Sequence, residues 1–303
     1  MAVGNRQSSA SGRQAWEGKS KGTRTGYRIF VGILRHFGVR PAYLLLRFVA
    51  FYYFLSSWKT SRAVLQFYRQ GLQMNKLRAL RMLYRNYYRL GQTLIDKVAA
   101  MAGIAGGFRS RSTGLEHLQA LASGGKGGIL LSAHVGNWEI AGHFLQKLNI
   151  RINLVMYDGE HQAIKEYLGS ITGPRSFNVI VIQPDNSHIY QIAGALGRGE
   201  LIGMHADRYL EGSKTLTLPF LGRPARFPEG PFLLAAKLRV PVTFVFAMKA
   251  GEMSYRFSAS PPIQAEQLKD TAPQTVLQAY ISEVENKVRE YPDQWFNYFP
   301  FWV

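Results

Sequence analysis

The pattern of apolar and polar positions changes twice along the chain. Residues 1–25 are rich in Ser, Gly, Arg and Lys and poor in apolar residues, which predicts a basic disordered tail. Residues 26–102 are strongly apolar at first and then carry apolar positions at helical spacing between basic ones. From residue 103 to 303, short apolar runs alternate with amphipathic stretches, which is typical of an α/β sheet.

The most apolar segment of the helical region runs from Ala42 to Leu55 and is interrupted by Arg47. It is shorter than the roughly 20 apolar residues that an ordinary membrane-spanning helix needs. Basic residues flank it and tyrosines lie near both ends, which favours a helix that lies in or dips into one leaflet of a membrane. We therefore predict that residues 26–102 form a helical membrane-anchoring region, and a buried core helix is the alternative for this run.

The remaining two thirds of the chain predict a mixed central sheet flanked by helices. The expected strands are residues 128–133, 152–156, 179–182, 201–205, 242–248 and, at an edge of the sheet, 255–259. The expected helices are residues 137–148, 187–196, 230–238 and 275–291. Ser187 is expected to cap the helix that it precedes.

Charge and composition narrow the possible partners. The chain has 37 Lys and Arg against 19 Asp and Glu, a net charge of +18, which favours nucleic acid, anionic lipid headgroups or an acidic carrier protein. The aromatic residues cluster in apolar runs and do not alternate with basic ones as a base-stacking surface requires, so we expect no nucleic-acid partner. The absence of cysteine excludes disulfides, a thiolate nucleophile and a cysteine-ligated metal.

One short stretch carries candidate chemistry. His134 follows an apolar strand directly, and Glu139 falls in the first turn of the next expected helix, so both belong at the carboxyl end of the sheet. A carboxylate that holds an imidazole in one tautomer makes it a general base for a hydroxyl or an amine. The same spacing also arises by chance, as a histidine at a strand end and a glutamate favourable to the helix dipole.

The wider segment 130–139, LLSAHVGNWE, closely resembles the signature of the lipid A late acyltransferases, which are lauroyl and myristoyl transferases of the lysophospholipid acyltransferase superfamily. The resemblance implies a glycerolipid acyltransferase-like α/β fold, His134 as the base and Glu139 as its orienting partner. It implies an acyl thioester on acyl carrier protein as the donor; acyl-CoA is the alternative. A lipid or an amphipathic molecule with a hydroxyl or amine would be the acceptor.

Further blocks in the family's order extend this resemblance loosely over residues 27–303 and well over 128–303. They are residues 204–208, 218–225, 231–235, 240–242 and 293–296. Two features depart from the lipid A branch. Residues 227–230 resemble the Pro-Glu-Gly block of the glycerolipid acyltransferases, and the ending 294–302 looks more like predicted acyltransferases of aryl polyene or amino-lipid pathways.

Acyl transfer of this kind needs donors for an oxyanion, an apolar slot and cations for phosphate groups. Backbone N–H groups near Val135 and Gly136 are the expected oxyanion donors, and Asn137 is either a further donor or the helix cap. The apolar slot would come from Trp138, Phe144, Phe220 and Phe232. Candidates for positioning the acceptor or the pantetheine phosphate are Asp207, Arg208, Arg223 and Arg226.

The other histidines, including His205, fit no metal-ligand spacing, so we expect no metal and no cofactor beyond the thioester co-substrate. An acyl carrier donor and the lack of a signal peptide imply the cytoplasmic face of a bacterial inner membrane. The alternative function is a noncatalytic basic protein that binds membrane or nucleic acid through its tail and helices.

Overall fold

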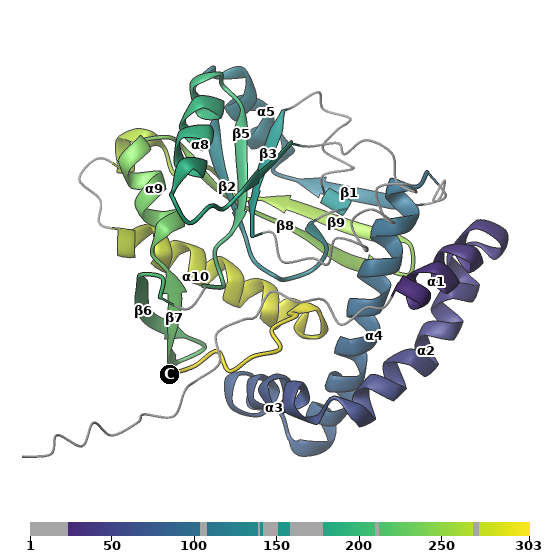
Figure 1. Ribbon diagram of the computed structural model, residues 1–303. Coiled ribbons are helices and arrows are strands. Elements are labelled where there is room, and N and C mark those ends of the chain that lie inside the picture. The colour runs from purple at the N-terminus through teal and green to yellow at the C-terminus, as the bar shows by residue number, and fades with distance from the viewer. Residues whose placement is uncertain are drawn as a thin grey trace, which may run out of the picture.

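The structure, a computed structural model, describes residues 24–103, 108–138, 140–141, 151–157, 178–209, 212–268 and 273–303. A central sheet with helices on both faces confirms the predicted α/β class (Figure 1). The predicted tail lies almost entirely outside the described residues, as does most of the helix predicted at 137–148.

Seven strands form the central sheet in the order β1-β9-β8-β2-β5-β3-β4. Every neighbouring pair is parallel except β8 with β9, so the sheet is mixed, as predicted. The strands are β1 (Arg109–Thr113), β2 (Gly128–Ser132), β3 (Ile152–Met156), β4 (Asn178–Val181), β5 (Leu201–His205), β8 (Val242–Gly251) and β9 (Ser254–Ala259).

The sequence prediction that residues 255–259 form an edge strand is wrong. Strand β9 pairs with β8 on one side and with β1 on the other, so β1 is the edge strand at this end of the sheet. All five residues of β1 are exposed and polar, RSRST, so no apolar run marks this strand in the sequence. A polar edge strand of this kind protects a sheet against pairing with other chains.

Alternation along β2 explains how helices cover both faces of the sheet. Ile129 and Leu131 pack in the core that includes the buried faces of α8, α9 and α10, while Leu130 points to the opposite face and packs with α5. The helices are α5 (Leu115–Ser123), α8 (Ser187–Gly197), α9 (Gly230–Leu238) and α10 (Pro273–Glu290), with 3₁₀ turns η3 (Ala265–Leu268) and η4 (Pro292–Gln294).

Two local features differ from the sequence prediction. Ser187 is the first residue of α8 and does not cap it; its N–H donates to Asp185 Oδ1 at 3.0 Å.

Strands β6 (Thr215–Phe220) and β7 (Arg223–Pro228) form a separate antiparallel hairpin that the apolar pattern does not predict. Its two turn residues, Leu221 and Gly222, both have positive φ, as a tight two-residue hairpin turn requires.

The predicted helical region consists of α1 (Arg24–Phe37), α2 (Val39–Ser56), α3 (Trp58–Gln66), the π-helical turn η1 (Phe67–Gly71) and α4 (Lys76–Met101). The second part of this region, where apolar positions recur at helical spacing, is broken between η1 and α4, where Gln73 takes a positive φ. Asn75 then caps α4 by accepting a hydrogen bond from the Arg78 N–H at 2.9 Å. Across the described residues, every helix is too short or too polar to cross a bilayer.

Helix α2 has two apolar faces, so the buried-helix alternative applies to one of them, and membrane anchoring stays a prediction. One face is buried against α1 and α4 through Ala42, Tyr43 and Leu46. The opposite face exposes a set of large apolar side chains, Leu44, Phe48, Phe51, Tyr52 and Leu55. Helix α4 in turn contributes Leu83 and Tyr87 to the core that contains the sheet residues Ile129 and Leu131.

Candidate active site

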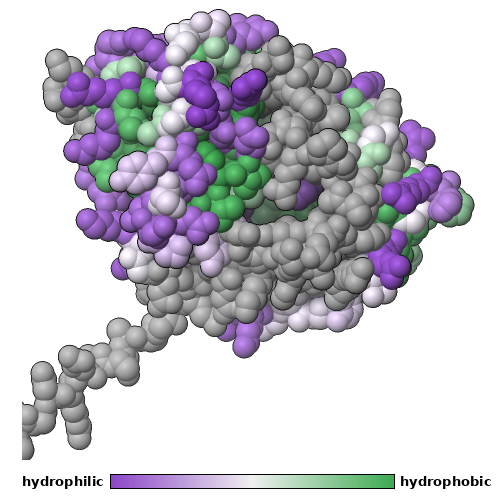
Figure 2. All heavy atoms as spheres, turned by 45° about the horizontal axis from the view of Figure 1, so that its top comes forward, coloured by the Kyte–Doolittle hydropathy of each residue, from purple (hydrophilic) through white to green (hydrophobic). Residues whose placement is uncertain are grey.

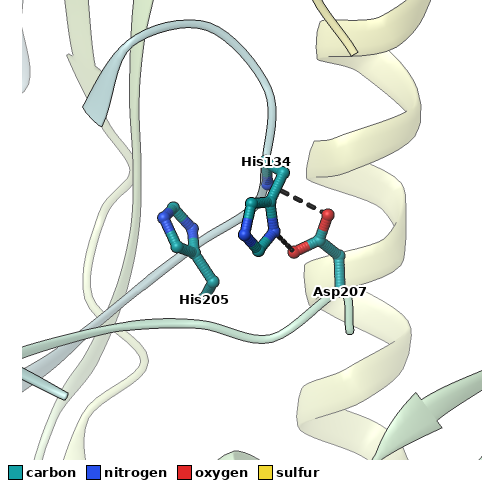
Figure 3. A group of neighbouring side chains, drawn as sticks. All are labelled: His134, His205 and Asp207. Atoms are coloured by element: carbon teal, nitrogen blue, oxygen red, sulfur yellow. Dashed lines mark hydrogen bonds and ion pairs between the residues drawn. The ribbon is translucent and has the colours of Figure 1, made fainter. Parts of the chain in front are cut away.

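His134 and Asp207 meet at the carboxyl edge of the sheet because they follow neighbouring parallel strands. Strands β2 and β5 are in register at Ser132 and His205, so each residue lies two positions beyond a paired strand end. His134 Nδ1 lies 2.8 Å from Asp207 Oδ1, and the His134 backbone N–H donates to Oδ2 at 3.0 Å (Figure 3). One carboxylate thus fixes both the backbone and the ring of His134.

The charge state of Asp207 suits this contact. Its side chain is 1% exposed, whereas the His134 side chain is 25% exposed. Burial by itself raises the pKa of Asp207, but the electrostatic attraction and hydrogen bond of the His134 ring, together with Arg208, hold this pKa well below its ordinary value. An ionised carboxylate only accepts hydrogen bonds, so His134 Nδ1 carries the hydrogen and Nε2 is the basic nitrogen.

The loop after His134 is held from two sides. Phe296 N–H donates to the His134 carbonyl and Gly136 N–H donates to the Gln294 carbonyl, both at 2.9 Å. Gly136 has a φ of 74°, and a Cβ added there would lie 2.3 Å from the Ala247 carbonyl oxygen. Only glycine fits this close backbone approach.

Glu139 lies outside the described residues, so its predicted orienting role stays a prediction. Asp207 was predicted to position the acceptor or a phosphate; its carboxylate is instead buried and engaged by His134. A contact of the kind predicted for Glu139 is made by Asp207, which lies 73 positions after His134.

Asn137 is 4% exposed and caps the turn that follows it. Its Oδ1 accepts from the Ile140 N–H at 3.3 Å, while Nδ2 donates to the Thr93 carbonyl at 3.1 Å and to the Tyr255 hydroxyl at 3.2 Å. This geometry supports the cap and leaves neither amide hydrogen for a substrate.

The three candidate arginines have different surroundings. Arg208 is partly buried; its Nη2 donates to the Phe296 carbonyl at 2.6 Å, which ties the segment after β5 to residues near the end of the chain. Arg223 hydrogen-bonds Gln70 and lies over the Trp302 ring at 5.3 Å. Arg226 is exposed on the same β6–β7 hairpin, so two of the three lie off the central sheet.

The predicted apolar slot is only partly supported. Phe220 and Phe232 are fully buried core residues and do not line an open surface, and Phe144 lies outside the described residues. Trp138 is partly exposed and meets the ring of His205 edge-on, with centroids 5.3 Å apart.

His205, which the sequence analysis gave no role, lies beside His134. The ring centroids are 4.4 Å apart, too close for side-by-side rings, so the two rings face each other with their planes 32° apart. Among the described residues, His134, His205 and Asp207 each offer a metal-ligand atom, all within 4.8 Å of one another. Nitrogen lone pairs lie in the ring planes, so facing rings do not converge on one ion unless a ring turns. The expected absence of a metal stays a prediction.

A buried ionic network behind the site was also not foreseen. Lys249 Nζ donates to Asp96 Oδ2 at 2.5 Å and to the Tyr43 hydroxyl at 2.9 Å, and both charged side chains are 0% exposed. Tyr43 and Tyr255 both donate to the Asp96 carboxylate. Because Tyr255 also accepts from Asn137, the network joins α2 and α4 to the loop that follows His134.

A buried carboxylate in contact with a partly exposed histidine is an arrangement that enzymes use to activate a hydroxyl or an amine. Comparison with known proteins assigns the chain more narrowly. The family model described as bacterial lipid A biosynthesis acyltransferase matches residues 81–302. The chain belongs to this family of lipid-biosynthesis acyltransferases.

Individual relatives are distant. Phosphatidylinositol mannoside acyltransferases of two Mycobacterium tuberculosis strains are 22% identical to this chain over 191 residues, or 63% of its length. The match spans 59% of the length of those relatives. The crystal structure of PlsC, a 1-acyl-sn-glycerophosphate acyltransferase from Thermotoga maritima, aligns with 85% of this chain and 99% of its own at 14% identity and a TM-score of 0.39.

Proposed function

We propose that this protein transfers a fatty acyl group from a thioester, on acyl carrier protein or coenzyme A, to a hydroxyl or amine of a lipid or amphipathic acceptor. The observation that carries the proposal is the 2.8 Å contact between His134 Nδ1 and Asp207 Oδ1 within a chain of the acyltransferase family. Asp207 keeps the hydrogen on Nδ1, so Nε2 takes the proton of the acceptor. Glu139 is a second candidate for orienting His134.

In the proposed reaction the acceptor oxygen or nitrogen attacks the thioester carbonyl carbon as His134 removes its proton. The carbonyl electrons move to the oxygen and form a tetrahedral oxyanion. When the carbonyl re-forms, the carbon–sulfur bond breaks, and the proton held by His134 passes to the leaving thiolate. The net products are the acylated acceptor and the free thiol.

The expected result of His134→Ala is loss of acyl transfer without loss of the fold. Lipids and acylated small molecules are extracted from cells that express the wild type or the variant at matched levels and compared by mass spectrometry. A species heavier by one acyl unit is expected only with the wild type. His117→Ala, which changes a histidine on α5, is the matched control. If His134→Ala yields the same acylated species as the wild type, the base assignment is wrong.

The same comparison of variants distinguishes acyl transfer from the alternative function. A noncatalytic basic protein would keep its cellular effect in His134→Ala and lose it on removal of residues 1–25. Purified wild type incubated with an acyl-carrier and a coenzyme A thioester distinguishes the two donors, because release of free thiol reports turnover with either.

The exposed face of α2 supports a location on the cytoplasmic surface of a bacterial inner membrane. Leu44, Phe48, Phe51, Tyr52 and Leu55 are each more than half exposed and recur at helical spacing, so they form one apolar face. Arg40, Arg47, Lys59 and Arg62 are exposed beside it. At the right edge of Figure 2, where α1 and α2 lie, hydrophilic and hydrophobic side chains are exposed side by side. An apolar helix face with basic neighbours suits an interface of anionic lipids.

Replacing Phe48 and Leu55 together by glutamate is expected to weaken vesicle binding by at least about 100-fold. Each buried side chain of this size contributes roughly 1.5–3 kcal/mol, and each 1.4 kcal/mol is a factor of ten. Flotation with phosphatidylcholine vesicles that contain phosphatidylglycerol measures the binding. Leu77→Glu, which changes an 80% exposed leucine on α4, is the matched control. Equal flotation of the double variant and the wild type would refute this docking face.

A further inference from the structure

Acyl transfer requires a donor for the oxyanion, and among the donors expected from the sequence those of Gly136 and Asn137 are already engaged. Gly136 N–H donates to the Gln294 carbonyl at 2.9 Å, and Asn137 N–H donates to the Ala247 carbonyl at 2.8 Å. Both side-chain amide hydrogens of Asn137 are directed at Thr93 and Tyr255. The His134 N–H is held by Asp207. The loop after β2 is therefore held rigidly by bonds that a substrate would have to break.

His205 offers a donor in the right place. It is the last residue of β5, in register with Ser132 at the end of β2, and its ring faces that of His134 (Figure 3). One nitrogen of His134 and one nitrogen of His205 lie within 4.8 Å of each other. Once the His205 ring turns, an attacking atom and a carbonyl oxygen can lie beside the two rings, each about 3 Å from one of these nitrogens.

In the part of the chain that the structure describes, neither nitrogen of His205 makes a hydrogen bond of good geometry, although the Ser132 backbone lies near enough to raise its pKa slightly. Both have less than 1 Å² of exposed surface and no hydrogen-bond partner, although the residue as a whole is partly exposed. Buried polar groups in folded proteins are nearly always paired, and exceptions concentrate at functional sites. The Trp138 ring, 5.3 Å away, covers another side of this imidazole.

The charge state of His205 suits a donor and not a second base. Burial, and next the charge of His134, lower the pKa of His205 to about 3. A neutral imidazole keeps one N–H at every working pH, and it does not compete with His134 for the acceptor proton.

We propose that His205 is a second catalytic residue, whose imidazole N–H hydrogen-bonds the carbonyl oxygen of the acyl thioester and stabilises the oxyanion. This inference rests on the proposed acyl transfer and names a group that acts in it. A turn of the ring about its Cβ–Cγ bond presents the N–H to the substrate. No proton is transferred from His205: the charge appears on the carbonyl oxygen as the acceptor attacks and disappears as the thiolate leaves.

The test compares His205→Phe, which keeps a flat ring beside His134 and Trp138 but has no donor, with His205→Gln, which keeps a donor near the position of Nε2. Purified proteins are assayed for thiol release and acylated product with one thioester donor. We expect His205→Phe to lower kcat by roughly 10²–10³-fold, with KM for the donor within a few fold and an unchanged melting temperature. His205→Gln should recover part of this loss, and His117→Phe on α5 should match the wild type.

The outcomes separate this inference from the proposed function. A wild type that releases no thiol and forms no acylated product overturns acyl transfer itself. An active wild type with an equally active His205→Phe overturns the role of His205 alone. A folded His205→Gln that is as impaired as His205→Phe also overturns the role of His205. A shift in the pH midpoint of kcat in His205→Phe does the same, because only a residue that acts through His134 would move that midpoint.

Discussion

Replacing Asp207 by asparagine is expected to lower kcat by roughly 10³–10⁴-fold while the fold is retained. Asparagine has one acceptor oxygen, whereas Asp207 accepts two hydrogen bonds from His134. If that oxygen keeps the bond to the backbone N–H, the amide nitrogen faces Nδ1, which must then act as the acceptor. The ring hydrogen moves to Nε2, and His134 is no longer a base toward the acceptor.

The measurement is kcat and KM of Asp207→Asn with the donor and acceptor that the cellular comparison identifies. A matched control is Glu200→Gln, because Glu200 is a buried carboxylate just before the opposite end of β5 and is paired with Arg198. The control is expected to lose some stability and keep its kcat. Near-normal activity of Asp207→Asn, together with an inactive Glu139→Gln, would return the orienting role to Glu139.

Replacing Lys249 by methionine is expected to lower the free energy of unfolding by about 3–5 kcal/mol. The change leaves the Asp96 carboxylate without its cation at a position that is 0% exposed. Burial already raises the pKa of Asp96 in the wild type, and Lys249 opposes this shift. In the variant, the pKa of Asp96 is higher in the folded protein than in the unfolded chain. The variant is therefore most stable at low pH, where Asp96 is protonated in both states, and it loses stability as pH rises above the ordinary aspartate pKa.

Urea unfolding at pH 5 and pH 8, followed by tryptophan fluorescence, measures this effect. The deficit of Lys249→Met relative to the wild type should be larger at pH 8. Adding Asp96→Leu should restore most of the stability, because two apolar groups need no counter-charge. Arg256→Gln, which breaks an exposed pair with Glu290, should cost at most about 1 kcal/mol. A single variant as stable as the wild type would mean that the network contributes little to the fold.

The fold was largely predictable because its elements are local patterns. The apolar runs at 128–133 and 201–205 place β2 and β5 within a residue of their bounds, since a buried parallel strand is apolar throughout. Strand β1 was missed because its residues are all exposed and polar, and only its pairing with β9 makes it a strand. The same reason explains why β9 was expected at the edge.

The site was predictable in part. The position of His134 at a strand end makes it a candidate base, and His205 ends a neighbouring strand in the same way. The contact of Asp207 with His134 spans 73 residues, and nothing local distinguishes it from an acceptor-binding aspartate. Asp96 is an isolated acidic residue in a basic helix, and its partner Lys249 lies 153 residues away.

The sequence by itself determined the α/β class, the helical region before it and the histidine at the carboxyl edge, because each depends on residues that are neighbours along the chain. Only the tertiary structure brought Asp207 to His134, engaged the N–H groups of Gly136 and Asn137 and exposed one face of α2. These depend on strand order, register and packing, which bring residues from distant parts of the chain within hydrogen-bonding distance.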